Sequence, residues 1–138
     1  MNKYLLDTNV ISELRKTKPH GGVLSWINSL QDGQIFISAL SLGELQSGIE
    51  LTRRQDFQKA QEIEIWVDQL AQSHQIIPMD ALCFREWARL LNAKPQQLAQ
   101  DAMIAATARV HTLIVATRNE RDFQIFGVDI LNPFKIKF

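Results

Sequence analysis

Cysteine, histidine and long apolar runs are scarce in this chain of 138 residues, and each shortage excludes a class of protein. The single cysteine, Cys83, has apolar neighbours, which predicts a small core residue and a reducing, cytoplasmic compartment. The three histidines, His20, His74 and His111, are too widely spaced for a zinc site. Asp7 interrupts the first apolar run, so we expect neither a signal peptide nor a membrane-spanning segment.

An excess of charge of one sign is also lacking, because 15 lysine and arginine residues balance 15 aspartate and glutamate residues. A net charge of zero gives no overall positive field of the kind that attracts nucleic acids, although a local basic rim is compatible with a neutral total. The length and the 46% hydrophobic content are typical of one globular domain over residues 1–138. Such a domain buries a core large enough to fold without disulfides or a structural metal.

Short apolar runs alternate with amphipathic segments along the whole chain, which is typical of an α/β fold with a parallel sheet. The predicted strands lie at residues 3–6, 35–37, 75–77, 113–116 and 128–131. The predicted helices lie at residues 10–15, 23–30, 41–49, 57–71, 80–91 and 98–111. The long amphipathic helix at 57–71 and the helix before it are separated by a polar turn, so we expect them to pair as an αα-hairpin arm.

The opening stretch, residues 3–11, places an acid directly after the first predicted strand. Asp7 ends the apolar run, and Thr8 or Asn9 is expected to cap the helix that follows. Open α/β sheets bind their ligands at the carboxyl ends of parallel strands. Asp7 is therefore a candidate functional residue, and other acids at the same edge of the sheet would define a site.

Glu44 has two interpretations. Ser41 and Glu44 stand three residues apart at the head of an apolar-striped segment, which is the pattern of a helix capping box. The competing interpretation turns Glu44 inward to meet Asp7. The residues alone leave both open.

Asp101 lies on an apolar face of the helix predicted at 98–111. Ile104, Ala105 and Ala108 follow it at helical spacing. An aspartate in a first turn stabilises a helix by only about 0.3–1 kcal/mol through the helix dipole. Burying a carboxylate without a partner costs much more than that, so a role in a site is the stronger interpretation.

The predicted loop at 117–123 follows the fourth strand and brings Asn119 and Asp122 to the same edge of the sheet. Asparagine and aspartate in loops are more often simple turn residues, and this alternative stays open.

Asp7, Asp101, Asp122 and Glu44 are thus expected to converge. Two carboxylates about 5 Å apart repel by roughly 3 kcal/mol at an effective dielectric constant of about 20, so a cluster of them needs protons or a divalent cation. Oxygen ligands without histidine or cysteine select Mg²⁺ or Mn²⁺ over zinc. The chemistry that this arrangement predicts is metal-assisted phosphodiester hydrolysis.

Four motifs resemble, in order and spacing, those of the PIN-domain nucleases, and most closely those of the VapC/FitB-type toxins of bacterial type II toxin–antitoxin modules. The motifs occupy residues 6–14, 41–45, 100–106 and 117–123, and the closing Asn132-Pro133-Phe134 also matches. The resemblance implies a PIN-like three-layer α/β/α domain with a central, mostly parallel sheet of four to five strands. It also implies a cytoplasmic endoribonuclease that depends on Mg²⁺ or Mn²⁺.

For the site, the resemblance implies Asp7, Glu44, Asp101 and a fourth acid as catalytic residues, with Asp7 and Asp101 holding the metal. Some relatives carry the fourth acid at the Asn119 position and others at the Asp122 position. We predict that Asp122 is the fourth acid here and that Asn119 is a neutral contact to water or metal.

Thr8 or Asn9 would then orient Asp7 from behind the metal shell. Arg118, Arg121 and the basic loop at 16–22 are candidates for RNA backbone contacts, and a plain surface role is an equal alternative. The resemblance further implies a homodimer and a hetero-oligomer with a cognate antitoxin, which would supply the binding to operator DNA; no membrane partner is expected.

An active nuclease has three alternatives. A receiver domain needs a lysine directly after a strand near the end of its sheet, and residues 117–123, which follow the strand at 113–116, contain none. A haloacid-dehalogenase-type phosphatase needs a second aspartate two residues after the first, where this chain has Asn9. A catalytically inactive PIN-like module that sequesters antitoxin or RNA stays open as the alternative function.

Overall fold

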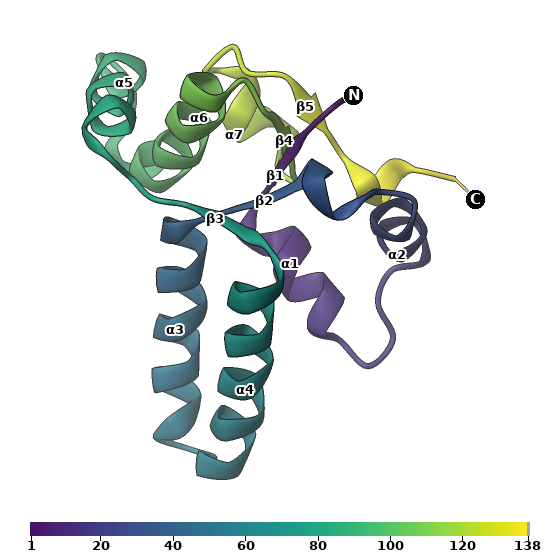
Figure 1. Ribbon diagram of the computed structural model, residues 1–138. Helices are drawn as coiled ribbons and strands as arrows, with labels where there is room; N and C mark the ends of the chain where they lie inside the picture. Colours follow the sequence, from purple (N-terminus) through teal and green to yellow (C-terminus); the bar gives the residue numbers. More distant parts are fainter. Residues whose placement is uncertain (138) are drawn as a thin grey trace.

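The computed structural model describes residues 1–137 and contains a five-stranded sheet (Figure 1). The strands are β1 (Tyr4–Leu6), β2 (Ile35–Ser38), β3 (Gln75–Ile77), β4 (Ile114–Ala116) and β5 (Ile130–Leu131). Their order in the sheet is β3-β2-β1-β4-β5, and each neighbouring pair is parallel. The predicted parallel sheet is confirmed, and β1, the strand that ends at Asp7, lies at its centre.

Helices cover both faces of this sheet, which confirms the expected α/β/α architecture. They are α1 (Thr8–Arg15), α2 (Gly21–Asn28), α3 (Ala39–Arg53), α4 (Phe57–Ser73), α5 (Ala81–Leu91), α6 (Ala99–His111) and α7 (Glu120–Gln124). Short 3-10 turns lie at residues 32–34, 96–98 and 133–135. None of the helices within residues 1–137 combines the length and apolarity that spanning a bilayer requires.

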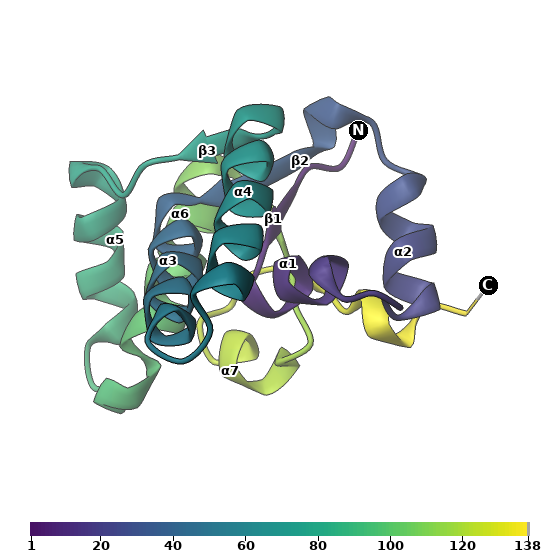
Figure 2. The ribbon, with the colours of Figure 1, turned by 90° about the horizontal axis from the view of Figure 1, so that it is seen from below.

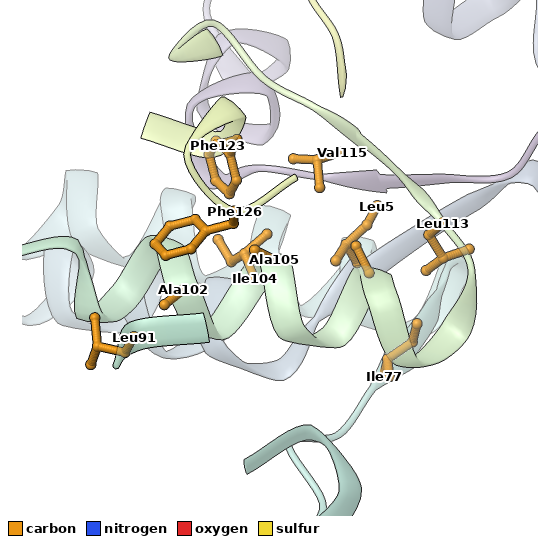
Figure 3. Packing of buried hydrophobic residues seen from close by; sticks show 11 residues of the cluster. Leu5, Ile77, Leu91, Ala102, Ile104, Ala105, Leu113, Val115, Phe123 and Phe126 are labelled. Carbon is orange, nitrogen blue, oxygen red and sulfur yellow. The ribbon is translucent and has the colours of Figure 1, made fainter. Parts of the chain in front are cut away.

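The two layers of helices follow from the alternation of side chains along β1. Leu5 points to one face, where it joins a cluster with Ala105 of α6, Val115 of β4 and Phe123 of α7 (Figure 3). Its neighbours Tyr4 and Leu6 point to the other face and pack with residues of α1 and α2. A strand that is buried on both faces needs apolar residues at successive positions, whereas a half-exposed strand alternates apolar and polar residues. The short continuous apolar run of β1 is therefore typical of a strand buried on both faces.

The αα-hairpin arm is present as predicted. Helices α3 and α4 lie side by side and project from the sheet (Figure 1). Ile49, Ala60 and Val67 are buried between them. Arg53 and Glu64 form an ion pair of 2.7 Å across the pair of helices.

Two details after β4 differ from the prediction. Residues 117–123 were expected to be a loop, but α7 begins at Glu120, because the buried side chain of Phe123 anchors a helical turn against α6. The last strand covers residues 130–131 and not 128–131. As an edge strand, β5 pairs with β4 alone.

Gly22 allows the C-terminal segment to pack over α2. A Cβ atom at Gly22 would lie 2.6 Å from the carbonyl oxygen of Ile136 and 3.1 Å from that of Pro133. Gly22→Ala should therefore lower the free energy of unfolding by about 1–3 kcal/mol in spite of the better helix propensity of alanine. Urea denaturation measures this change. Gly43→Ala is the matched control, because a Cβ atom there meets no atom within 4 Å and should stabilise the protein. A Gly22→Ala protein as stable as the parent would contradict the prediction.

Candidate active site at the carboxyl edge of the sheet

Asp7 connects the sheet to the first helix. Its backbone N–H extends the pairing with β4 by donating to the carbonyl of Ala116 at 2.9 Å, and Asp7 is only 5% exposed. Its Oδ1 accepts a hydrogen bond of 2.8 Å from the backbone N–H of Thr8 and so caps α1. The prediction that Thr8 or Asn9 caps this helix is wrong, because the helix begins immediately after the strand and leaves Asp7 as its capping residue.

The second carboxylate oxygen of Asp7 is held by two side chains. The hydroxyl of Thr117 donates to Oδ2 at 2.7 Å, and Nδ2 of Asn9 donates to it at 3.1 Å. Thr117 is fully buried, and its Oγ1 accepts a hydrogen bond of 2.9 Å from the backbone N–H of Asn119. Thr117 was not among the residues predicted for the site. The available signal was its position: it follows β4 as Asp7 follows β1, and β4 and β1 are paired in register.

Glu44 faces the opening stretch and does not cap its own helix. Helix α3 begins at Ala39, and its cap is Ser38, whose hydroxyl accepts from the backbone N–H of Leu40 at 3.1 Å. The capping-box interpretation of Ser41 and Glu44 is therefore wrong, because the helix begins directly at the end of β2. The hydroxyl of Thr8 donates to Oε1 of Glu44 at 2.7 Å and lies 2.9 Å from the hydroxyl of the buried Ser41.

Asp101 and Asp122 reach the same edge from two other helices. Asp101 lies in the first turn of α6 and Asp122 in the first turn of α7. In Figure 2, β1 runs down from the N-terminus to α1, and α7 lies at that same lower edge. The negative charges of Asp7, Asp122 and Glu44 all act on Asp101. The four predicted acids thus come from four elements and converge.

Burial and mutual repulsion make the ionised form of the acid cluster less favourable. Burial first, and then the charges of Asp7, Asp122 and Glu44, raise the pKa of Asp101 to about 6. Burial, helped by the charge of Glu44, also raises the pKa of Asp7 above its ordinary value, although the hydrogen bonds from Thr117, Thr8 and Asn9 oppose this rise. Within residues 1–137, no lysine or arginine forms an ion pair with any of the four acids. A cation at this edge would lower the free energy of the ionised cluster.

The donor set fits a hard divalent ion held partly through water. No group of three histidine, cysteine, aspartate or glutamate side chains within the described chain is spaced to enclose a metal ion. Mg²⁺ does not need such an enclosure, because it keeps several waters and commonly binds one or two carboxylates. Carboxylate and amide oxygens without a thiol or an imidazole also favour Mg²⁺ or Mn²⁺ over zinc.

The neutral and basic candidates lie on the rim of the cluster. Arg118, Asn119 and Arg121 are exposed, and together with Glu120 and Asp122 they line a hollow of about 350 Å³. Asn119 precedes α7 but makes no side-chain cap. In the basic loop at 16–22, Lys16 is already paired with the buried carboxylate of Glu13 at 2.9 Å.

Fold and site together define a class of protein, a parallel α/β/α domain with a cluster of acids at the carboxyl edge of its sheet. The sequence matches the PIN domain family over residues 4–127, and the chain therefore belongs to the PIN-domain family.

Two relatives of this chain match it along nearly their whole length. The VapC ribonuclease Y4jK of Sinorhizobium fredii is 37% identical over 139 residues, with 95% of this chain and 97% of that protein covered. The toxin FitB of Neisseria gonorrhoeae is 33% identical over 142 residues, with 94% and 97% covered.

Solved structures agree with the fold. The crystal structure of FitAcB from Neisseria gonorrhoeae superposes with a TM-score of 0.86 at 30% identity and covers 96% of this chain and 99% of that one. DNA-bound VapBC from Salmonella typhimurium superposes with a TM-score of 0.79 at 23% identity, covering 96% and 99%, and supports the fold alone.

Proposed function

We propose that this chain is a metal-dependent endoribonuclease that hydrolyses RNA phosphodiester bonds at the cluster of Asp7, Glu44, Asp101 and Asp122. The observation that carries this proposal is the gathering of four acids from different elements around the first turn of α6, where burial and the charges of the other three raise the pKa of Asp101. Residues 1–137 provide no basic ion-pair partner for this anionic cluster. Its place at the ligand-binding edge of a parallel sheet is suited to a divalent cation. Membership of the PIN-domain family and the names of the ribonuclease and toxin relatives support the same activity.

The residues divide into ion-holding and water-orienting groups. Asp7 and Asp101 would hold Mg²⁺ or Mn²⁺, directly or through water. Such an ion, when bound, neutralises charge that grows on the phosphodiester and makes a water more acidic. Glu44 and Asp122 would complete the shell or accept a proton from the attacking water, whose oxygen forms the new bond to phosphorus as the RNA oxygen leaves. Asn119 would be a neutral contact in this arrangement.

The hydrogen bonds around Asp7 and Glu44 prepare these carboxylates for such roles. Three donors fix both oxygens of Asp7, so the carboxylate does not have to be ordered when an ion binds. The Thr8 hydroxyl fixes one oxygen of Glu44 and leaves the other free. All four acids are present, and hydrogen bonds orient two of them. This arrangement favours an enzyme over the alternative, an inactive PIN-like module that only sequesters antitoxin or RNA.

We also propose a cognate antitoxin as the physiological partner and the cytoplasm as the location. The relative FitB is named a toxin, and a solved structure that is 29% identical to this chain holds FitAB bound to a DNA fragment. The net charge of zero disfavours direct DNA binding by this chain, so operator contacts would come from the antitoxin. A homodimer within such an assembly belongs to the same proposal.

Thr8→Val should lower the rate of RNA cleavage about 10–100-fold, the usual range for a residue that orients a ligand from behind the metal shell. The valine keeps the side-chain shape but cannot donate to Glu44. Glu44→Gln should lower the rate as well. The glutamine still accepts the hydrogen bond from Thr8, but it lacks the negative charge of the carboxylate. Gel assays with Mg²⁺ measure both rates. Thr52→Val is the control, since Thr52 donates only to the carbonyl of Gly48 in α3. Full activity of Glu44→Gln would show that Glu44 is merely structural.

The function itself is tested by brief expression in bacteria, followed by sequencing of the fragment ends of total RNA. The intact chain should generate new, recurring ends that are absent when Asp7→Asn is expressed at the same level. Identical fragment patterns from the two proteins, together with growth arrest by both, would favour the inactive binding module.

A further inference from the structure

Arg118 is a cation that is held in place without an acidic partner. Its guanidinium carbon lies 3.9 Å from the ring centroid of Phe134, which is stacking distance. No carboxylate within residues 1–137 forms an ion pair with Arg118. The buried acid on which its charge acts, Glu13, already accepts hydrogen bonds from Lys16 and from the backbone N–H of His20. The positive charge of Arg118 is therefore available to a ligand.

The ring beneath Arg118 is itself fixed. The backbone N–H of Phe134 donates to Oδ1 of Asn132 at 3.0 Å, and the preceding Pro133 is buried. The ring of His20 lies 5.3 Å from that of Phe134, and Nδ1 of His20 accepts from the backbone of Gly22 at 3.1 Å. The C-terminal turn that carries Phe134 lies beside the lower end of α2 in Figure 2. This anchoring makes Phe134 a rigid platform.

The position of Arg118 is set relative to Asp7 by hydrogen bonds. The backbone N–H of Arg118 donates to Oδ1 of Asn9 at 3.3 Å, and the amide of the same Asn9 donates to Oδ2 of Asp7 at 3.1 Å. Thr117, the residue before Arg118, donates to the same Asp7 oxygen. One side chain therefore separates the Arg118 backbone from the acid cluster.

We propose that Arg118, stacked on Phe134, binds a backbone phosphate of single-stranded RNA next to the acid cluster and so positions the strand. A guanidinium that stacks through its face leaves the N–H groups at its edge free, and these match the geometry of phosphate oxygens. The contact would offset the repulsion between the four carboxylates and the incoming phosphates. This inference rests on the proposed action on RNA and identifies a positioning residue for it.

Salt dependence of RNA binding gives a direct test. A labelled single-stranded RNA of mixed sequence is titrated by fluorescence anisotropy at several salt concentrations, with Asp7→Asn as the background that prevents cleavage. Adding Arg118→Ala should weaken binding and lower the slope of log Kd against log salt by about 0.7, the value for one phosphate contact on a single strand. Arg85→Ala is the control. Arg85 is exposed on α5 next to Glu86, which pairs with Arg109 near the end of α6 remote from Asp101.

The role of the platform is tested by Phe134→Leu, which keeps the charge and an apolar side chain. It should weaken binding about twofold to fivefold, the loss of an exposed cation–π contact, and leave the salt slope unchanged. In the Arg118→Ala background the same change should have no further effect. Thermal unfolding of every variant checks that the fold is kept.

The inference is overturned if Arg118→Ala alters the salt slope no more than Arg85→Ala does, or if the background protein binds no RNA. If the parent cleaves RNA but Arg118→Ala leaves the slope of log Kd against log salt unchanged, the Arg118 contact is excluded and the nuclease proposal is unaffected. If Arg118→Ala reduces the slope but the parent does not cleave RNA, the Arg118 contact is supported and the nuclease proposal is contradicted.

Discussion

Asp7→Asn should reduce Mg²⁺-dependent RNA cleavage roughly 10²–10³-fold or more, the effect of losing several kcal/mol of transition-state charge stabilisation. The amide nearly preserves the shape of the side chain, and asparagine caps a helix as well as aspartate does. The change removes one negative charge from a buried carboxylate whose pKa is raised by burial and by Glu44. We therefore expect the metal-free variant to unfold at an equal or higher temperature than the parent.

The control for this substitution is Asp32→Asn, the same chemical change at an exposed residue in the turn that precedes β2. It should change neither the cleavage rate nor the unfolding temperature. Calorimetry and a gel assay on the same samples separate the two effects. A large loss of stability in Asp7→Asn would show that Asp7 is a structural cap first, and the cleavage result would then say little about catalysis.

Saturating Mg²⁺ or Mn²⁺ should raise the unfolding temperature by roughly 10 °C above about pH 7. A ligand at about 100 times its Kd stabilises a protein by about 2.7 kcal/mol, and a domain of this size converts each kcal/mol into several degrees. The shift should shrink as the pH falls through about 6, because Asp101 then retains its proton and the ion has to displace it.

In the metal-free protein, the titration of Asp101 should make the free energy of unfolding depend on pH. The pKa of Asp101 in the folded state, about 6, exceeds its ordinary value of 3.8. Between these values the folded chain binds more protons than the unfolded chain, so the free energy of unfolding falls as the pH rises from about 4 to about 6. Urea denaturation with a chelator present measures this fall.

Asp101→Asn provides the decisive comparison for both measurements. It should remove this part of the pH dependence and most of the metal-induced rise in unfolding temperature. Asp32→Asn should behave like the parent in both. A rise that is equally large in Asp101→Asn, or equally large at pH values on both sides of 6, would contradict a metal site that includes Asp101.

The positions of the strands and of the acids were predictable because they depend on local pattern. A short continuous apolar run indicates a strand buried on both faces, and β1, β2 and β4 each lie within one residue of the predicted run. Chain direction then places any residue after a parallel strand at the carboxyl edge. This reasoning is sufficient to bring Asp7 and the segment after β4 together without knowledge of a single contact.

The failures concern boundaries and partners. The start of α3 at Ala39 was missed because the alternative cap, Ser41, has an equally suitable side chain; only the docking of Ser41 against Thr8 excludes it. Thr117 and Asp7 are 110 positions apart, and their hydrogen bond exists because β1 and β4 pair in register. No local pattern contains that information.

The sequence by itself determined the alternation of strands and helices, the neutral total charge and the places along the chain where acids follow strands. Tertiary structure alone decided that Asp7 caps α1, that the hydroxyl of Thr8 donates to Glu44 and that Arg118 stacks on Phe134. The division has a physical reason: burial patterns are set by neighbouring residues, whereas the partner of each polar group is set by which distant segments the sheet brings together.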